Sequence, residues 1–107
     1  MDSNLKIFTV YDSKAECYIN PFFLPNRGVA LRAFTEAARD TQHDFHRWAA
    51  DYTLFEIGEW DPGSGTILMH EARVSLGCAI DFRGEGGSVT PLMEMARERR
   101  KVNDEPA

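Results

Sequence analysis

The chain has few cysteines, no long apolar run and no basic leader, and each shortage excludes a class of protein. Among its 107 residues the only two cysteines, Cys17 and Cys78, lie far apart and are too few for a disulfide framework. No apolar stretch approaches the roughly 20 residues that a membrane-spanning helix needs. The first residues are polar and acidic, the reverse of a signal-peptide start. We therefore expect a cytoplasmic protein with two buried, reduced thiols and no membrane contact.

Positive charge is also scarce. The 12 Lys and Arg residues stand against 17 Asp and Glu residues, which gives a formal net charge of −5. Non-specific affinity for duplex DNA comes from neutralised phosphates, so this balance argues against a simple basic coat for the duplex. Apolar residues make up 43% of the chain and aromatic residues 11%, which is the composition of a globular domain rather than of a disordered chain. A domain of this size has room for one site.

The sequence lacks the common motifs of catalysis and cofactor binding. It contains no G-x-S-x-G elbow, and the glycines of residues 84–87 are not followed by the Lys-Ser/Thr pair of a phosphate-binding loop. Glu56 and Glu59 are three residues apart on an expected strand, so they should point to opposite faces and not act as a pair. We predict a protein that is not an enzyme and uses no cofactor. A small nuclease or hydrolase is the weakest of the alternatives.

Histidine offers one metal-site alternative. His43 and His46 are spaced as two ligands, and Asp44 and Asp51 lie near them in sequence. A structural zinc site usually has four ligands, and no cysteine pair lies near these histidines in the sequence. We predict solvent-exposed loop histidines and no metal. Convergence of His43, His46 and Asp44 on a cation would support the enzyme alternative.

Hydrophobic patterning predicts an α+β fold with a mostly antiparallel sheet of about five strands, made of two hairpins and a fifth strand. One helix covers one face of that sheet, and a short C-terminal helix follows. The expected elements, in chain order, are strands at 5–11 and 15–20, an apolar connector at 22–25 that is not a central strand, a helix at 27–40, a polar loop at 41–51, strands at 52–60, 66–70 and 73–83, and a helix at 92–101.

The main helix has a clear N-cap and one apolar stripe. Asn26 is a favourable N-cap residue, and the following run is rich in alanine. The apolar positions recur with helical spacing and comprise Ala30, Leu31, Phe34, Ala37 and Ala38. Small residues on this stripe would let the helix lie close to the sheet.

The last part of the chain has a different composition. We predict one α+β domain over residues 1–83, followed over residues 84–107 by a Gly-rich linker, a short helix with a basic end and a frayed tail. Arg97 and the run 99–101 complete the dipole of that helix in one interpretation. In the other they form a phosphate-contacting arm on a glycine hinge.

The aromatic residues suggest a binding face. On the first strand we expect Ile7, Thr9 and Tyr11 to face the core, and Lys6 and Phe8 to face the other way. A sheet with one helix leaves its far face open, where Lys6, Phe8 and Tyr18 would form a stacking platform for a nucleic-acid single strand. The competing interpretation is a homodimer through this open face, because exposed apolar surface often marks an interface.

Several blocks of the sequence resemble one family, in the right order and with similar spacing. The blocks are residues 6–16, 21–23, 27–34, 51–61 and 74–77, among them Lys6-Ile7-Phe8-Thr9-Val10-Tyr11 and Val74-Ser75-Leu76-Gly77. They resemble the small nonstructural protein of gokushoviruses, which are single-stranded DNA microviruses of bacteria. The likeness covers about residues 5–82 and does not include the basic tail.

The resemblance implies a phage accessory protein in the cytoplasm of the host bacterium. Such proteins are commonly described as DNA-binding, with a role in the change from duplex replication to single-stranded genome synthesis and packaging. It supplies no catalytic residues. We therefore predict binding of single-stranded viral DNA, with cations contacting phosphates and aromatic rings stacking on bases. The predicted contact residues are Lys6, Phe8, Tyr18, Arg27, Arg32, Arg39, Arg47 and Trp48.

The negative charge favours an alternative. In that interpretation the protein is an acidic adaptor that binds a viral or host replication protein, with no direct DNA contact. Direct binding to DNA phosphates weakens steeply as the salt concentration rises. An adaptor would not bind DNA at any salt concentration, so a salt titration with DNA distinguishes the two interpretations.

Overall fold

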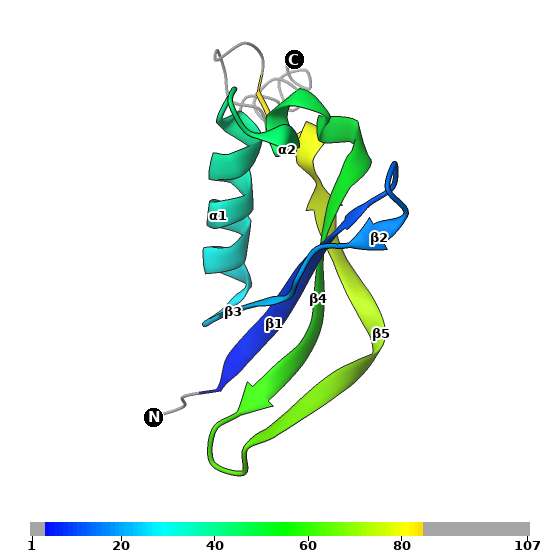
Figure 1. Ribbon diagram of the computed structural model, residues 1–107. Coiled ribbons are helices and arrows are strands. Elements are labelled where there is room, and N and C mark those ends of the chain that lie inside the picture. The colour runs from blue at the N-terminus through cyan, green and yellow to red at the C-terminus, as the bar shows by residue number, and fades with distance from the viewer. Residues whose placement is uncertain (1–3, 85–107) are drawn as a thin grey trace, which may run out of the picture.

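The computed structural model describes residues 4–84, which form one antiparallel sheet with a single long helix on one face (Figure 1). The predicted α+β class is confirmed, including a five-stranded sheet. In chain order the elements are β1 (Leu5–Asp12), β2 (Cys17–Tyr18), β3 (Phe22–Leu24), α1 (Arg27–Arg39), α2 (Asp44–Arg47), the 3-10 turn η1 (Ala49–Asp51), β4 (Tyr52–Asp61), β5 (Thr66–Cys78) and the 3-10 turn η2 (Ala79–Asp81). The predicted helix at 92–101 and all of the predicted linker beyond Gly84 lie outside the described residues.

β1 is the strand around which the sheet is built. It pairs antiparallel with β4 along one edge and with the short strands β2 and β3 along the other. Its central residues, Ile7 to Val10, are all buried. The expectation that the core leaves one face of this strand open is therefore wrong at its centre. The segment between β2 and β3 folds over that face, where the Thr9 hydroxyl donates to the Ile19 carbonyl at 2.8 Å.

α1 forms and packs as its sequence predicts. The Asn26 side chain accepts a hydrogen bond from the Val29 amide at 2.9 Å and so caps the helix. Ala30, Phe34 and Ala38 are buried against the sheet. These three residues form one core cluster with Phe8 and Val10 of β1 and Leu54 of β4. This helix covers one face of the sheet, called here the helix face.

The predicted polar loop at 41–51 is more ordered than expected, because α2 and η1 lie within it. Phe45 anchors the segment, with its ring centroid 5.4 Å from that of Phe34 and 4.6 Å from that of Tyr52. An aromatic residue in a polar stretch thus closes the end of the core.

The pairing of β4 with β1 and with β5 is irregular, and on β5 Leu76 is an extra residue between Ser75, which pairs with Phe55, and Gly77, which pairs with Leu54. On β4, Ile57 is an extra residue between Glu56, which pairs with Phe8, and Gly58, which pairs with Ile7. On β5, Met69 pairs with Gly58 and Val74 pairs with Glu56, so residues 70–73 face a single residue of β4. β5 bends away from β4 at this point (Figure 1). The strands predicted separately at 66–70 and 73–83 are thus one strand with a bent middle.

The end of the described chain differs from prediction. The alternating strand expected up to residue 83 stops at Cys78, and η2 follows. Ile80, expected on the inner face, is 44% exposed, while the ring of Phe82 meets that of Phe34 edge-on. The prediction of two buried thiols is also wrong, because Cys17 lies exposed on the peripheral strand β2 and Cys78 is half-buried.

Candidate nucleic-acid interface

The face of the sheet opposite α1 carries a cluster of aromatic rings beside an arginine. This cluster, called the open-face patch, consists of Tyr11, Tyr18, Phe55 and Arg73. The Tyr18 ring lies 4.7 Å from that of Tyr11 and 6.2 Å from that of Phe55, measured between centroids. The Arg73 guanidinium carbon is 5.2 Å from the Tyr18 centroid, in cation–π range. Tyr18 is 42% exposed, so part of the patch is available to a flat ligand.

A cavity of about 580 Å³ adjoins the patch. Tyr18, Phe55, Ile57 and Arg73 contribute to its walls, and His70 and Glu71 add polar groups. The bend of β5 at residues 70–73 shapes this side of the cavity. The volume is within the range of small-ligand sites, and apolar walls with a few polar groups are typical of them.

Of the predicted contact residues, Tyr18 lies on the open face, but Phe8 does not. Phe8 has no exposed surface and belongs to the core with Phe34 and Leu54. The predicted assignment of the β1 faces is therefore wrong. The pair Phe8 and Val10 offers purely apolar surface to α1, whereas the other face carries the hydroxyls of Thr9 and Tyr11.

The predicted cations do not gather at the patch. Lys6 lies 3.9 Å from a Glu59 oxygen, on the side of the sheet that carries Phe8. The Arg27 guanidinium binds Glu56 from the first turn of α1. Arg32 and Arg39 are exposed on α1, away from its buried stripe.

Two of the predicted arginines form contacts away from the patch. Arg39 donates from Nε to the Phe82 carbonyl at 3.2 Å. Arg47 forms an ion pair with Asp44 at 2.7 Å within α2. Among the described cations, Arg73 is the one that contacts the aromatic rings of the patch, and it was not among the predicted contact residues.

Trp48 is 60% exposed but lines a separate cavity of about 480 Å³ with Asp12, Lys14 and Asp51. The surroundings are acidic. Burial, followed by the negative charges of Asp12, Asp44 and Asp51, raises the pKa of the neighbouring Tyr52. A phosphate would meet repulsion there, so Trp48 is a poor partner for a nucleic-acid backbone.

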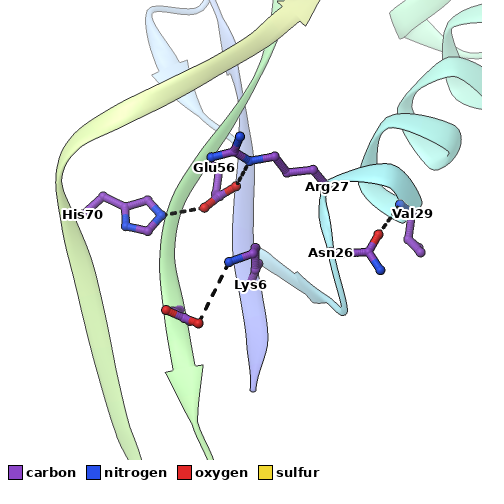
Figure 2. A network of polar contacts seen from close by, with 7 residues as sticks. Lys6, Asn26, Arg27, Val29, Glu56 and His70 are labelled. Atoms are coloured by element: carbon purple, nitrogen blue, oxygen red, sulfur yellow. Dashed lines mark hydrogen bonds and ion pairs between the residues drawn. The ribbon is translucent and has the colours of Figure 1, made fainter. Parts of the chain in front are cut away.

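A buried carboxylate lies between β4, β5 and α1 (Figure 2). Glu56 is 2% exposed, and its two oxygens bind Arg27 Nε at 2.5 Å and His70 Nε2 at 2.7 Å. Burial alone raises the pKa of Glu56. The hydrogen bonds from Arg27 and His70 and the charges of Arg27 and Lys6 outweigh it, so the pKa lies below its ordinary value. Glu56 is therefore ionised at neutral pH.

The bulge at Ile57 changes the relation between the two strand glutamates. Glu56 pairs with Phe8 and Glu59 with Lys6, two residues that share one side of β1. The prediction that the glutamates point to opposite faces is therefore wrong. Each is engaged by a different cation, Arg27 for Glu56 and Lys6 for Glu59.

The loop histidines bond to the backbone. His43 Nδ1 accepts from the Phe45 amide at 3.0 Å and caps α2, and His46 Nδ1 donates to the Ala38 carbonyl at 2.9 Å. Both are half-buried rather than exposed as predicted. Within residues 4–84, no cluster of three or more His, Cys, Asp or Glu residues is arranged to hold a metal ion, and no helix is long and apolar enough to cross a membrane.

Tyr11, Phe55 and Arg73 were missed as members of the patch. The position of the hydroxyl residues on β1 is the signal for Tyr11, because a face with Thr9 and Tyr11 is more polar than one with Phe8 and Val10. The contact of Arg73 with Tyr18 depends on the bend of β5, for which the sequence carries no recognisable signal.

The fold and the patch define the class of the molecule: a small α+β domain whose antiparallel sheet has a helix on one face and an aromatic cluster with an arginine on the other. Comparison with known families then identifies it. The sequence model of the Phage ORF5 protein family matches residues 5–82, and the chain belongs to this family of bacteriophage proteins. No curated protein and no solved structure matches the chain significantly.

Proposed function

We propose that the protein binds single-stranded viral DNA through the open-face patch and catalyses no reaction. The observation that carries the proposal is the cluster of Tyr11, Tyr18 and Phe55, whose rings meet tilted and edge-on, with Arg73 over the Tyr18 ring. Proteins that hold single strands combine aromatic rings for the bases with cations for the backbone. Membership of a phage family and the resemblance to a nonstructural DNA-binding protein support this ligand.

The proposed role is in viral single-stranded DNA synthesis, the replication switch or packaging, inside the host bacterium. An unpaired base stacks on Tyr18 at the mouth of the cavity, and the neighbouring phosphate is met by Arg73. Few cations adjoin the patch, so stacking supplies more of the affinity than charge does. The expected salt dependence is accordingly shallow, with a slope of about one phosphate contact.

The test is fluorescence anisotropy of a labelled single-stranded oligonucleotide with the full chain. We expect Tyr18→Ala to raise Kd roughly tenfold, equivalent to about 1.4 kcal/mol, because one stacked base is lost. Arg73→Gln should weaken binding and lower the salt slope by about one.

Trp48→Ala is the matched control. It removes an exposed aromatic ring from the acidic cavity and leaves the patch unchanged, so Kd should stay at the wild-type value. Absence of binding at low salt would refute the proposal. Equal losses in Tyr18→Ala and Trp48→Ala would place the contact elsewhere.

A second candidate is the acidic adaptor for a viral or host replication protein. Two observations favour it: residues 4–84 contain eight basic against eleven acidic side chains, and three consecutive apolar residues of β5, Ile67 to Met69, are exposed. An adaptor would bind its protein partner equally well with Tyr18→Ala, and the oligonucleotide would not bind at all.

A further inference from the structure

β5 presents a long edge to solvent within the described part of the chain. The strand order β2-β1-β4-β5 leaves it paired on one side only, and at 13 residues it is the longest strand of the sheet. Ile67, Leu68 and Met69 are 47%, 57% and 62% exposed. A long apolar edge is a template for another strand, and natural proteins usually protect such edges.

The backbone of the middle of this edge lies outside the ladder with β4, although the His70 side chain binds Glu56 there. Residues 70–73 have no register partners on β4, whereas the residues before and after them do. Ala72 lies at the centre of the bend and is exposed, as are Glu71 and Arg73. Glu71 and Arg73 are two positions apart on a strand, so they share one side of β5, and both line the open-face cavity.

We propose that two copies of this chain pair antiparallel along their β5 edges, about a twofold axis at Ala72. This operation places Glu71 of each copy opposite Arg73 of the other, which forms two ion pairs of opposite charge. Facing residues of opposite charge stabilise antiparallel strands, and like charges in the same place destabilise them. The edge is thus complementary in charge to itself, as an isologous interface must be.

The same register covers exposed apolar carbon at both ends of the contact. Met69 of one copy faces the small Ser75 of the other, and Leu68 faces Leu76. Large side chains therefore meet small or apolar ones, and no carboxylate is set opposite another. This match favours a second copy over an unrelated strand as the occupant of the edge.

Symmetry has a consequence for the open face. Antiparallel pairing of identical edges requires an axis perpendicular to the sheet, so both open faces lie on the same side of one continuous sheet. Two patches then lie side by side across the joined edges. The dimer itself does not depend on DNA binding, and it is measured without DNA.

The experiment is sedimentation equilibrium of the full chain over a wide range of protein concentrations. We expect a monomer–dimer equilibrium for the wild type. Glu71→Arg and Arg73→Glu should each weaken dimerisation at least tenfold, because like charges then face each other. The double variant Glu71→Arg/Arg73→Glu restores opposite charges in exchanged positions and should recover the dimer. Glu36→Arg, a charge reversal on the exposed side of α1, is the matched control and should dimerise normally.

A monomer at every concentration overturns the proposal. So does a dimer that neither single reversal weakens, or a double variant no better than the singles. Circular dichroism establishes that each variant is folded. Ala72 has no register partner on β4, so Ala72→Pro should abolish the dimer while preserving the fold. Tyr18→Ala should still dimerise, so a failure of the DNA proposal is recognised separately.

Discussion

At the scale of single residues, Glu56 is the most constrained ionisable group. It is a buried carboxylate satisfied from two directions, by Arg27 from the helix and His70 from the bent strand. A buried charge with one partner removed is costly, whereas one with both partners in place is well tolerated. The network therefore ties α1 and the middle of β5 to β4, and it holds His70 at the wall of the open-face cavity.

Replacing Glu56 should change how the free energy of unfolding depends on pH. The folded-state pKa of Glu56 is lowered, so its contribution is present above the unfolded-state pKa and is lost as pH falls through the folded-state pKa. Glu56→Gln should lower the free energy of unfolding at neutral pH by about 2 kcal/mol, and the gap to wild type should narrow on acidification. Urea denaturation at a series of pH values measures this. Glu36→Gln, on the exposed side of α1, is the control; an unchanged gap across pH would contradict the assignment.

At the scale of elements, β4 and β5 approach each other so closely beside the bend that only glycine fits at residue 58. A Cβ added at Gly58 would lie 2.7 Å from the Leu68 carbonyl oxygen and 3.3 Å from the Met69 Cα. These are backbone atoms, which cannot turn aside as a side chain would. Gly58 therefore permits the hairpin to remain paired directly beside the bulge at Ile57.

Gly58→Ala tests this contact. We expect a loss of about 1–3 kcal/mol in the free energy of unfolding, because the strands must separate locally to admit a methyl group. Gly63→Ala is the matched control in the hairpin turn, where the nearest atom is an Asp61 side-chain oxygen at 3.3 Å. Thermal or urea unfolding provides the comparison, and similar losses in the two variants would argue against the close approach.

The elements also show what could be predicted from sequence. The capped and striped helix α1 was predictable because its signals are local: Asn26 and the apolar positions at helical spacing. Which face of β1 is covered by α1 could not be predicted, because strand alternation defines two faces and does not say which of them the helix covers. The bulge at Ile57 and the bend at 70–73 arise from pairing between strands, which local sequence signals do not report. The bulge places Glu56 and Glu59 on the same face instead of opposite faces. The bend brings Arg73 to Tyr18.

At the scale of the whole molecule, the net charge bears on which form of DNA the proposed patch would bind. The chain carries a net charge of −5, and several of its described cations are held by carboxylates. A duplex offers phosphates on its outside and keeps its bases stacked within, so it can use neither the patch nor a broad basic surface.

We therefore expect a strong preference for single strands. In competition against a labelled single-stranded oligonucleotide, unlabelled strand of the same sequence should displace the probe at concentrations at least tenfold lower than the duplex requires. Equal competition by the two would mean that phosphates, not bases, are recognised, and would favour a binding surface other than the patch.

The four-against-one mismatch between β5 and β4 has a consequence for chain length. In a regular strand, one residue gained or lost turns every later side chain to the other face. Here the two stretches of pairing on either side of residues 70–73 are set independently, one by the hairpin turn and the other by the core contacts of Leu76 and Phe82. An insertion or deletion within residues 71–73, which leaves the contact of His70 with Glu56 in place, would thus be absorbed in the bend, and this is where the length of the strand can vary without loss of register.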